Sequence, residues 1–250
     1  MHNTLQGKVA VVTGGSSGIG LASARLFATH GAQVVVTARR QDMLDAAVRD
    51  IGHGAIGIRG DVAELAHHAA LARELGLRFG RVDVYMANAG MIRINASREV
   101  TPEEFDAQFA TNTRGVFFGV QSVLPLMRRG GSIILTSSLA ATKVLAGHAV
   151  YAGTKAAIAA FARNWALELR STGVRINVLS PGPVETAILD KLGVPDAERP
   201  AFLQSMAEAI PTGRMGTAEE LARAALFLAS DASSFVNGIE LRADGGMALT

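Results

Sequence analysis

Short valine-rich apolar runs alternate along this chain with longer segments of helical character, and this alternation restricts the possible folds more than any other feature. Apolar runs of strand length lie at 8–13, 33–38, 55–59, 82–86, 132–137, 174–179 and 238–241. Helical patterns lie between them at 18–30, 42–51, 63–79, from 101 onward, 150–171 and 217–229. Wholly apolar strands are buried on both faces, and parallel neighbours need long crossovers that helices can supply. We therefore predict an α/β fold: a single doubly wound Rossmann-like domain over 1–250, with a central seven-stranded parallel sheet and helices on both faces.

Composition excludes several classes of function. The chain has 250 residues, with 24 Lys and Arg against 22 Asp and Glu, a formal net charge of +2, and 49% hydrophobic residues. So small a charge offers little attraction for nucleic acid or an anionic membrane, while the hydrophobic content suits a globular core. Because cysteine is absent, neither disulfides nor thiolate metal sites are expected, and no uncharged run has the length of a membrane span. We predict a cytoplasmic protein that binds neither nucleic acid nor membranes.

A glycine-rich turn, TGGSSGIG at 13–20, joins the first apolar run to the first helical segment. A helix N-terminus binds anions through free N–H groups and its positive dipole end, and glycine lets the backbone approach them closely. The turn is therefore predicted to hold the pyrophosphate of a dinucleotide, through Gly14, Ser16, Ser17, Gly18, Ile19 and Gly20. Its spacing, G-x-x-x-G-x-G, differs from the G-x-G-x-x-G of the long-chain dehydrogenase fingerprint.

Tyr151 and Lys155 lie four residues apart at the start of a predicted helix, so both side chains project from one helix face. A nearby ammonium favours phenolate and brings the pKa of a tyrosine, ordinarily about 10, closer to neutrality. Such a pair alone is also typical of a solvated helix face. Ser138 supplies the context, because it lies thirteen residues before Tyr151 at the end of an apolar run, where open α/β sheets bind ligands.

Together these motifs resemble the short-chain dehydrogenase/reductase family, in its order and spacing, from Gly7 to Gly246. The resemblance rests on Thr13-Gly14-x-x-x-Gly18-x-Gly20, Asn88-Ala89-Gly90, Asn112, Ser138, Tyr151-x-x-x-Lys155, Pro181-Gly182 and Asp244-Gly245-Gly246. One position departs from it, because Ala87 stands where the family's N-N-A-G motif has its first asparagine. Each motif is weak alone, but their joint occurrence is specific.

The resemblance implies a reaction and a set of roles. Ser138 and Tyr151 would hydrogen-bond a substrate carbonyl oxygen, Tyr151 would also transfer the proton, and hydride would pass between the carbonyl carbon and a nicotinamide. Lys155 would hold the nicotinamide ribose and depress the pKa of Tyr151, and Asn112, in the helix that begins at 101, would support a proton-relaying water chain. Further cofactor contacts implied by the resemblance are Asp61, Val62, Asn88, Ala89, Gly90, Pro181, Gly182, Val184 and Thr186.

The end of the second apolar run predicts which nicotinamide cofactor is used. Family members that prefer NAD place a carboxylate there for the ribose hydroxyls, but this chain has Ala38 followed by Arg39 and Arg40. A guanidinium is permanently charged and matches phosphate geometry. We therefore expect NADP(H), with NAD(H) less favoured, although Ser17 occupies a turn position where many NADP-binding members carry a basic residue.

Substrate contacts are expected from mostly apolar segments at 139–150, 91–94 and a lid at 185–214 that is interrupted by three prolines. They include Leu139, Leu145 and Ile188, and they favour an apolar ketone or secondary alcohol as substrate. His67 and His68 have no spaced carboxylate or cysteine partners and are expected to be solvated, with no metal site. The family resemblance also implies a homotetramer.

Two alternatives stay open at this point. A 3-oxoacyl-[acyl-carrier-protein] reductase would share these motifs, with Arg128 and Arg129 available to dock an acidic carrier protein, although Ser171-Thr172 adds no charge. A non-catalytic NADP(H)-sensing Rossmann protein would bind the cofactor without turnover.

Overall fold

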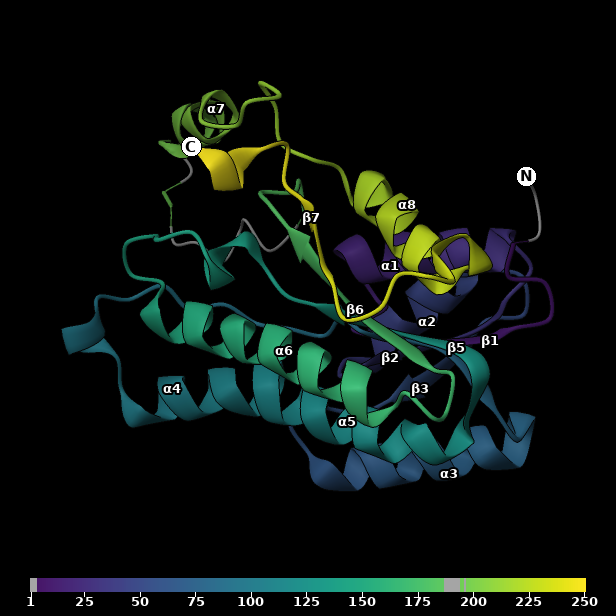
Figure 1. Ribbon diagram of the computed structural model, residues 1–250. Helices are drawn as coiled ribbons and strands as arrows, with labels where there is room; N and C mark the ends of the chain where they lie inside the picture. The colour runs from purple at the N-terminus through teal and green to yellow at the C-terminus, as the bar shows by residue number, and fades with distance from the viewer. Residues whose placement is uncertain (1–3, 187–193, 196) are drawn as a thin grey trace.

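The computed structural model describes residues 4–186, 194, 195 and 197–250. Its centre is a sheet of seven parallel strands in the order β3-β2-β1-β4-β5-β6-β7 (Figure 1). The strands are β1 Val9–Thr13, β2 Gln33–Ala38, β3 Ile56–Arg59, β4 Val82–Ala87, β5 Met127–Thr136, β6 Arg175–Pro181 and β7 Glu240–Ala243. The helices are α1 Gly18–Thr29, α2 Gln41–Ile51, α3 Leu65–Phe79, α4 Pro102–Phe109, α5 Gly115–Val123, α6 Ala149–Glu168, α7 Arg199–Glu208 and α8 Ala218–Ala229. The predicted doubly wound α/β fold is thereby confirmed.

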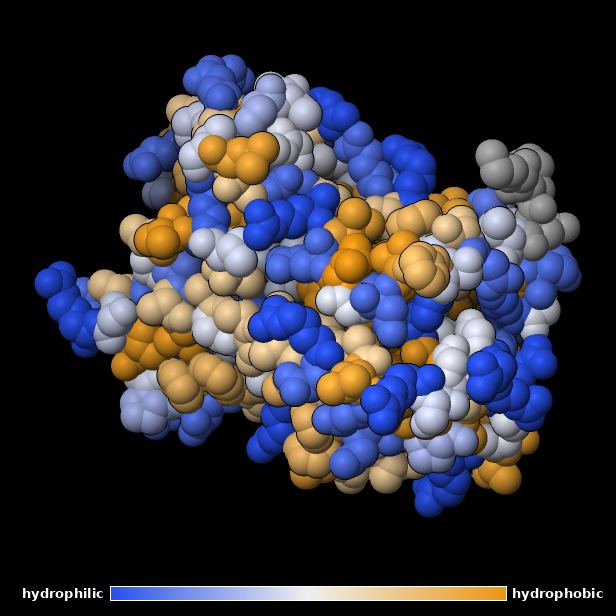
Figure 2. Space-filling view, viewed as in Figure 1, coloured by the Kyte–Doolittle hydropathy of each residue, from blue (hydrophilic) through white to orange (hydrophobic). Residues whose placement is uncertain are grey.

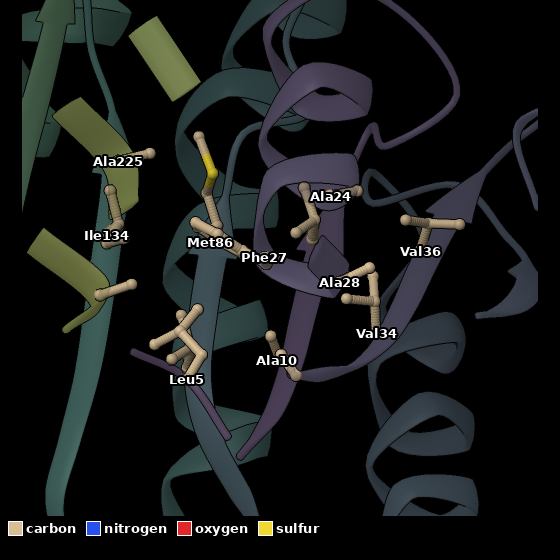
Figure 3. Packing of buried hydrophobic residues seen from close by; sticks show 14 of the residues in the cluster. Leu5, Ala10, Ala24, Phe27, Ala28, Val34, Val36, Met86, Ile134 and Ala225 are labelled. Carbon is tan, nitrogen blue, oxygen red and sulfur yellow. The ribbon is translucent and has the colours of Figure 1, made fainter. Parts of the chain in front are cut away.

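Each face of the sheet carries its own hydrophobic core, because alternate residues of the buried strands point to opposite sides. Ala10 and Val12 belong to the core shared with α1 and α8, whereas Val11 belongs to the core shared with α3, α5 and α6. Figure 3 shows the first of these cores, where Phe27 of α1 lies near Ala10 and Met86 of the strands. Burial on both faces explains the unbroken apolar runs in the sequence.

The helix predicted from 101 onward is not one continuous α-helix. Thr101 caps α4, with its hydroxyl oxygen accepting a hydrogen bond from the Glu104 N–H at 3.3 Å. Residues Ala110–Arg114 then form a π-helical turn before α5. Such turns carry one extra residue and are frequent at functional sites. This one contains Asn112, so the structure corrects the predicted element at a candidate site residue.

The prediction that His67 and His68 are solvated is wrong. On α3 their exposed fractions are 9% and 2%, and the Nε2 of His68 is hydrogen-bonded to the carbonyl oxygen of Val62 at 2.8 Å. Burial is the main cause that lowers the pKa of both imidazoles. Within the described ranges there is no group of three or more His, Cys, Asp or Glu placed to hold a metal.

The surface mixes hydrophilic and hydrophobic side chains, and Figure 2 shows the hydrophobic ones gathered in several separate places. Large hydrophobic residues with much of their surface exposed include Leu77, Val144, Leu167, Phe235 and Leu249. Among the residues that the structure describes, no helix combines the length and apolar character needed to cross a membrane. The predicted homotetramer stays a prediction.

Candidate active site

A cleft of about 610 Å³ lies at the carboxyl ends of the strands, a volume typical of small-molecule and cofactor sites. The strand order reverses between β1 and β4, which is where open α/β sheets bind ligands. The cleft brings together the predicted residues Gly14, Ser16, Ser17, Gly18, Ile19, Arg39, Arg40, Asp61, Val62, Asn88, Ala89, Gly90, Ser138, Tyr151, Lys155, Pro181, Gly182, Val184 and Thr186.

The glycine-rich turn enters α1 with its N–H groups uncapped. Ser17 is the N-cap residue, yet its side chain makes no capping hydrogen bond, and the first turn holds no acidic residue. Gly18 has φ +53°, a left-handed conformation that favours glycine. Asn88 ties the turn to β4, because its Nδ2 donates to the carbonyl oxygens of Thr13 at 3.1 Å and Gly14 at 3.3 Å. The turn is thus held rigidly with free donors, which suits an anion.

Gly20 does not line the cleft but supports this turn. A Cβ at Gly20 would lie 2.5 Å from the Nδ2 of Asn88, closer than atoms can pack. Any side chain there would displace the Asn88 amide. Gly20 therefore contributes to the predicted cofactor site by close packing.

Three polar side chains meet at the other end of the cleft. Ser138 follows β5, Tyr151 and Lys155 lie in the first turns of α6, and the Tyr151 and Ser138 side chains are hydrogen-bonded to each other. The Nζ of Lys155 lies 5.9 Å from the centre of the Tyr151 ring and donates to the Thr136 carbonyl oxygen at 2.8 Å. The neighbouring Ser137 hydroxyl is engaged elsewhere, because it donates to the Lys155 carbonyl oxygen at 2.9 Å. Ser138 is thus the serine that faces the tyrosine.

Burial controls the protonation of this group. It raises the pKa of Tyr151, and the hydrogen bond from Ser138 offsets only part of that rise. Burial also lowers the pKa of Lys155 to about 8. The expected depression of the Tyr151 pKa by Lys155 is therefore not found, because burial raises that pKa and Ser138 is the side chain that lowers it. A phenol with a raised pKa keeps its proton at neutral pH, so the Tyr151 hydroxyl can donate a hydrogen bond there.

Asn112 lies behind this group rather than on the cleft surface. Its side chain is fully buried and bonds both backbone groups of Met91, with Oδ1 accepting from the N–H and Nδ2 donating to the carbonyl oxygen, each at 2.8 Å. Nδ2 also donates to Thr154 Oγ1 at 3.1 Å, and that hydroxyl donates to the Tyr151 carbonyl oxygen at 2.7 Å. The side chain of Asn112 therefore links the Met91 loop to α6, while its predicted part in a water chain stays a prediction.

Two threonines of the cleft were not found from the sequence. Thr37 at the end of β2 and Thr136 at the end of β5 line the cleft, and both Oγ1 atoms are buried without a hydrogen-bond partner. A buried hydroxyl without a partner costs free energy, and both of these hydroxyls belong to residues in the wall of the cleft. The free donors of the turn and the buried ammonium of Lys155 together fit a nicotinamide dinucleotide.

The end of the cleft opposite Ser138, Tyr151 and Lys155 is open to solvent and carries arginine side chains. The Arg39 side chain is 69% exposed, and its NH1 lies 3.8 Å from Oδ2 of Asp61. Asp61 also accepts a hydrogen bond from the Ala63 N–H at 2.9 Å. An exposed ion pair at this distance contributes little, so the guanidinium is free to turn toward a ligand.

The predicted substrate contacts have mixed outcomes. Met91 lines the cleft, whereas Leu139 is not among the lining residues and is only 4% exposed, so it is part of the protein interior. Leu145 is half-buried and lies outside the set of lining residues. Ile188 lies outside the described residues, as does part of the predicted lid.

Comparison with known proteins agrees with this architecture. Residues 14–248 match the family model described as enoyl-(acyl carrier protein) reductase. An oxidoreductase of Sarocladium schorii is 42% identical over 246 residues, covering 98% of this chain and 97% of that protein. The chain belongs to the short-chain dehydrogenase/reductase family. Its members are oxidoreductases that use nicotinamide cofactors and act on small molecules.

Two further relatives span the whole chain. Versicolorin reductase 1 of Aspergillus parasiticus is 37% identical over 258 residues, covering 98% of each protein. A solved structure titled short chain dehydrogenase/reductase family protein superposes with a TM-score of 0.87 at 38% identity, covering 99% of this chain and 100% of that one. The likeness therefore extends through every element that positions the cleft.

Proposed function

We propose that this short-chain dehydrogenase/reductase interconverts an apolar ketone and its secondary alcohol with NADP(H). The observation that carries the proposal is the hydrogen-bonded pair of Ser138 and Tyr151 beside the buried Lys155 at the carboxyl edge of the sheet. Two neighbouring hydroxyl groups can both donate hydrogen bonds to one substrate oxygen on which negative charge develops.

Residues of this chain transfer the proton and position the substrate. A bound nicotinamide cofactor supplies or accepts the hydride at the substrate carbon. In reduction, the Ser138 hydroxyl donates a hydrogen bond to the carbonyl oxygen, and Tyr151 gives that oxygen its proton, which leaves a secondary alcohol. The Lys155 ammonium then stabilises the phenolate that forms. In oxidation Tyr151 takes the proton back.

Cofactor binding is assigned to both ends of the cleft. The uncapped N–H groups of Gly18, Ile19 and the turn before them would hold the pyrophosphate. Asp61 and Val62 would flank the adenine, and Asn88, Ala89 and Gly90 would lie along the ribose of the nicotinamide half with Lys155. The segment after β6 would hold the carboxamide, through Pro181, Gly182, Val184 and Thr186.

NADP(H) rather than NAD(H) is favoured by the charges after β2. Ala38 ends this strand without a carboxylate, and Arg39 and Arg40 follow it at the rim of the cleft. A carboxylate at Ala38 would repel a 2′-phosphate, whereas two guanidiniums attract one.

Substrate class and assembly are inferred from the lining and the surface. Met91 and Pro183 provide apolar contacts in the cleft, which favours an uncharged ketone as the small-molecule substrate. A homotetramer would cover exposed hydrophobic side chains such as Leu167 and Phe235. A carrier-protein substrate is supported less well. Arg128 and Arg129 lie at the start of β5, whereas Ser138 follows the end of the same strand. The two arginines are therefore at the opposite edge of the sheet from the proposed catalytic residues.

The test is turnover of NADPH and NADH against apolar ketones, diketones, aldehydes and a 3-oxoacyl thioester, measured by the absorbance of the reduced nicotinamide. We expect NADPH-dependent reduction of a ketone, and a loss of about 10³-fold in Tyr151→Phe with the NADPH dissociation constant unchanged. Turnover of the thioester alone would replace the ketone by an acyl-carrier substrate. NADPH binding without turnover of any carbonyl would support the sensing protein instead.

A further inference from the structure

A third arginine, Arg59, lies beside the end of the cleft that is assigned to the adenosine of the cofactor, although it is exposed and is not itself among the lining residues. Arg59 is the last residue of β3 and pairs with Ala38, the last residue of β2. Its Nε donates to the backbone carbonyl oxygen of Arg39 at 3.1 Å. The guanidinium of Arg59 thus touches the residue that carries the first of the two predicted phosphate-binding side chains.

This hydrogen bond fixes the turn from which Arg39 projects. Arg39 lies between the end of β2 and Arg40, the N-cap residue of α2. Arg39 itself is held by little else, since its guanidinium is exposed and only 3.8 Å from a single Asp61 oxygen. A donor on its carbonyl therefore sets the direction in which the Arg39 side chain leaves the sheet.

The charges at this rim match a phosphate monoester better than a hydroxyl pair. Arg39 and Arg40 line this end of the cleft, and Arg59 contacts the Arg39 backbone, so three positive charges lie close to one negative charge on Asp61, which also accepts a hydrogen bond from the Ala63 N–H. A phosphate monoester carries about −1.5 to −2 at neutral pH, so it would balance the remaining two positive charges. A ribose with free 2′- and 3′-hydroxyls would leave them uncompensated.

We propose that Arg59 is a specificity-determining residue for the 2′-phosphate of the cofactor. It acts in two ways: its Nε holds the Arg39 backbone, and its charge adds to the field at the phosphate. The inference rests on the proposed use of NADP(H). The sequence indicates selection of NADP(H) over NAD(H) only at the end of β2, and we infer that a residue at the end of β3 contributes to the same selection.

The experiment measures dissociation constants by isothermal titration calorimetry, so no turnover is needed. Wild type, Arg59→Met, Arg59→Lys and a control, Arg49→Met, are each titrated with NADP⁺, NAD⁺ and adenosine 2′,5′-bisphosphate. Arg49 is an exposed arginine of α2 outside the cleft, and its replacement makes the same change in net charge. We expect Arg59→Met to weaken NADP⁺ and the bisphosphate about tenfold, with NAD⁺ changed less than about twofold.

The variants separate the backbone contact of Arg59 from its charge. They also distinguish a failure of the proposed role of Arg59 from a failure of the proposed cofactor. Arg59→Lys keeps the charge, so it should recover part of the lost NADP⁺ affinity, and Arg49→Met should bind as wild type does. An Arg59→Met protein with an unchanged ratio of NADP⁺ to NAD⁺ affinity, in a wild type that prefers NADP⁺, would overturn the role of Arg59 alone. A wild type without such a preference would overturn both this role and the proposed cofactor.

Discussion

The charged side chains at the two ends of the cleft differ in how deeply they are buried and in how many polar partners they have. At the proposed catalytic end, Lys155 and Tyr151 are both buried, and each has defined polar contacts. At the proposed adenosine end, the Arg39 side chain is 69% exposed and has one weak partner. A buried charge is sensitive to every neighbour, whereas an exposed one is screened by water and tolerates replacement. The catalytic end is therefore expected to be fixed in chemistry, and the adenosine end to be adjustable.

Replacing Lys155 by Met tests the buried end most severely. Removal of the ammonium should lower kcat/KM by about 10³-fold, because the phenolate of Tyr151 loses its neighbouring cation. Since burial disfavours the charged lysine, the melting temperature should stay the same or rise. Steady-state kinetics and thermal unfolding of the same preparation check both parts. A strong loss of stability would show that Lys155 acts mainly as a structural residue.

Arg39→Asp tests the exposed end. The new carboxylate would repel a 2′-phosphate and accept hydrogen bonds from ribose hydroxyls, so the ratio of kcat/KM with NADPH to that with NADH should fall about 10²-fold. The melting temperature should not change, because Arg39 makes only an exposed contact. Arg49→Asp is the matched control and should keep the wild-type ratio. An unchanged ratio in Arg39→Asp would remove the argument for NADP(H).

The pH dependence of the reduction sharpens the contrast. The pKa of Lys155 is about 8, so its cation is lost as pH rises through that value. The rate should accordingly be flat below about pH 7, fall to about half at pH 8, and fall about fivefold further between pH 8 and 9. Affinity for NADP⁺ should change little over the same range, since the arginines stay charged. A reduction rate that stays flat to pH 9.5 would contradict the assigned role of the lysine cation.

Much of this site could be predicted because its positions follow from regular geometry. Strand ends and helical spacing place Ser138, Tyr151 and Lys155 together, and the structure brings them into one cleft as predicted. The raised pKa of Tyr151 could not be predicted, because it depends on burial that no motif encodes. The unpartnered hydroxyls of Thr37 and Thr136 belong to no motif either.

Two further features differ from the sequence prediction, and only one of them has a signal in the local sequence. The π-helical turn at Asn112 reflects tertiary hydrogen bonds to Met91, which local sequence does not reveal. The burial of His68 was detectable, because it shares one face of α3 with Leu71 and Leu75 at helical spacing. For a histidine on an apolar helix face, the periodicity of its neighbours predicts burial better than the polarity of its own side chain does.

The histidines beneath the adenosine end give the smallest expected effect. Burial lowers the pKa of His67 and His68 from 6.5, so as pH falls below 6.5 the unfolded chain takes up protons that the folded chain does not, and stability decreases. We expect the melting temperature to drop by a few degrees between pH 7 and 5.5, and by less in His68→Gln. His53→Asn, at an exposed histidine, should keep the wild-type slope. If the melting temperature changed equally with pH in all three proteins, the buried histidines of α3 would not contribute to the pH dependence of stability.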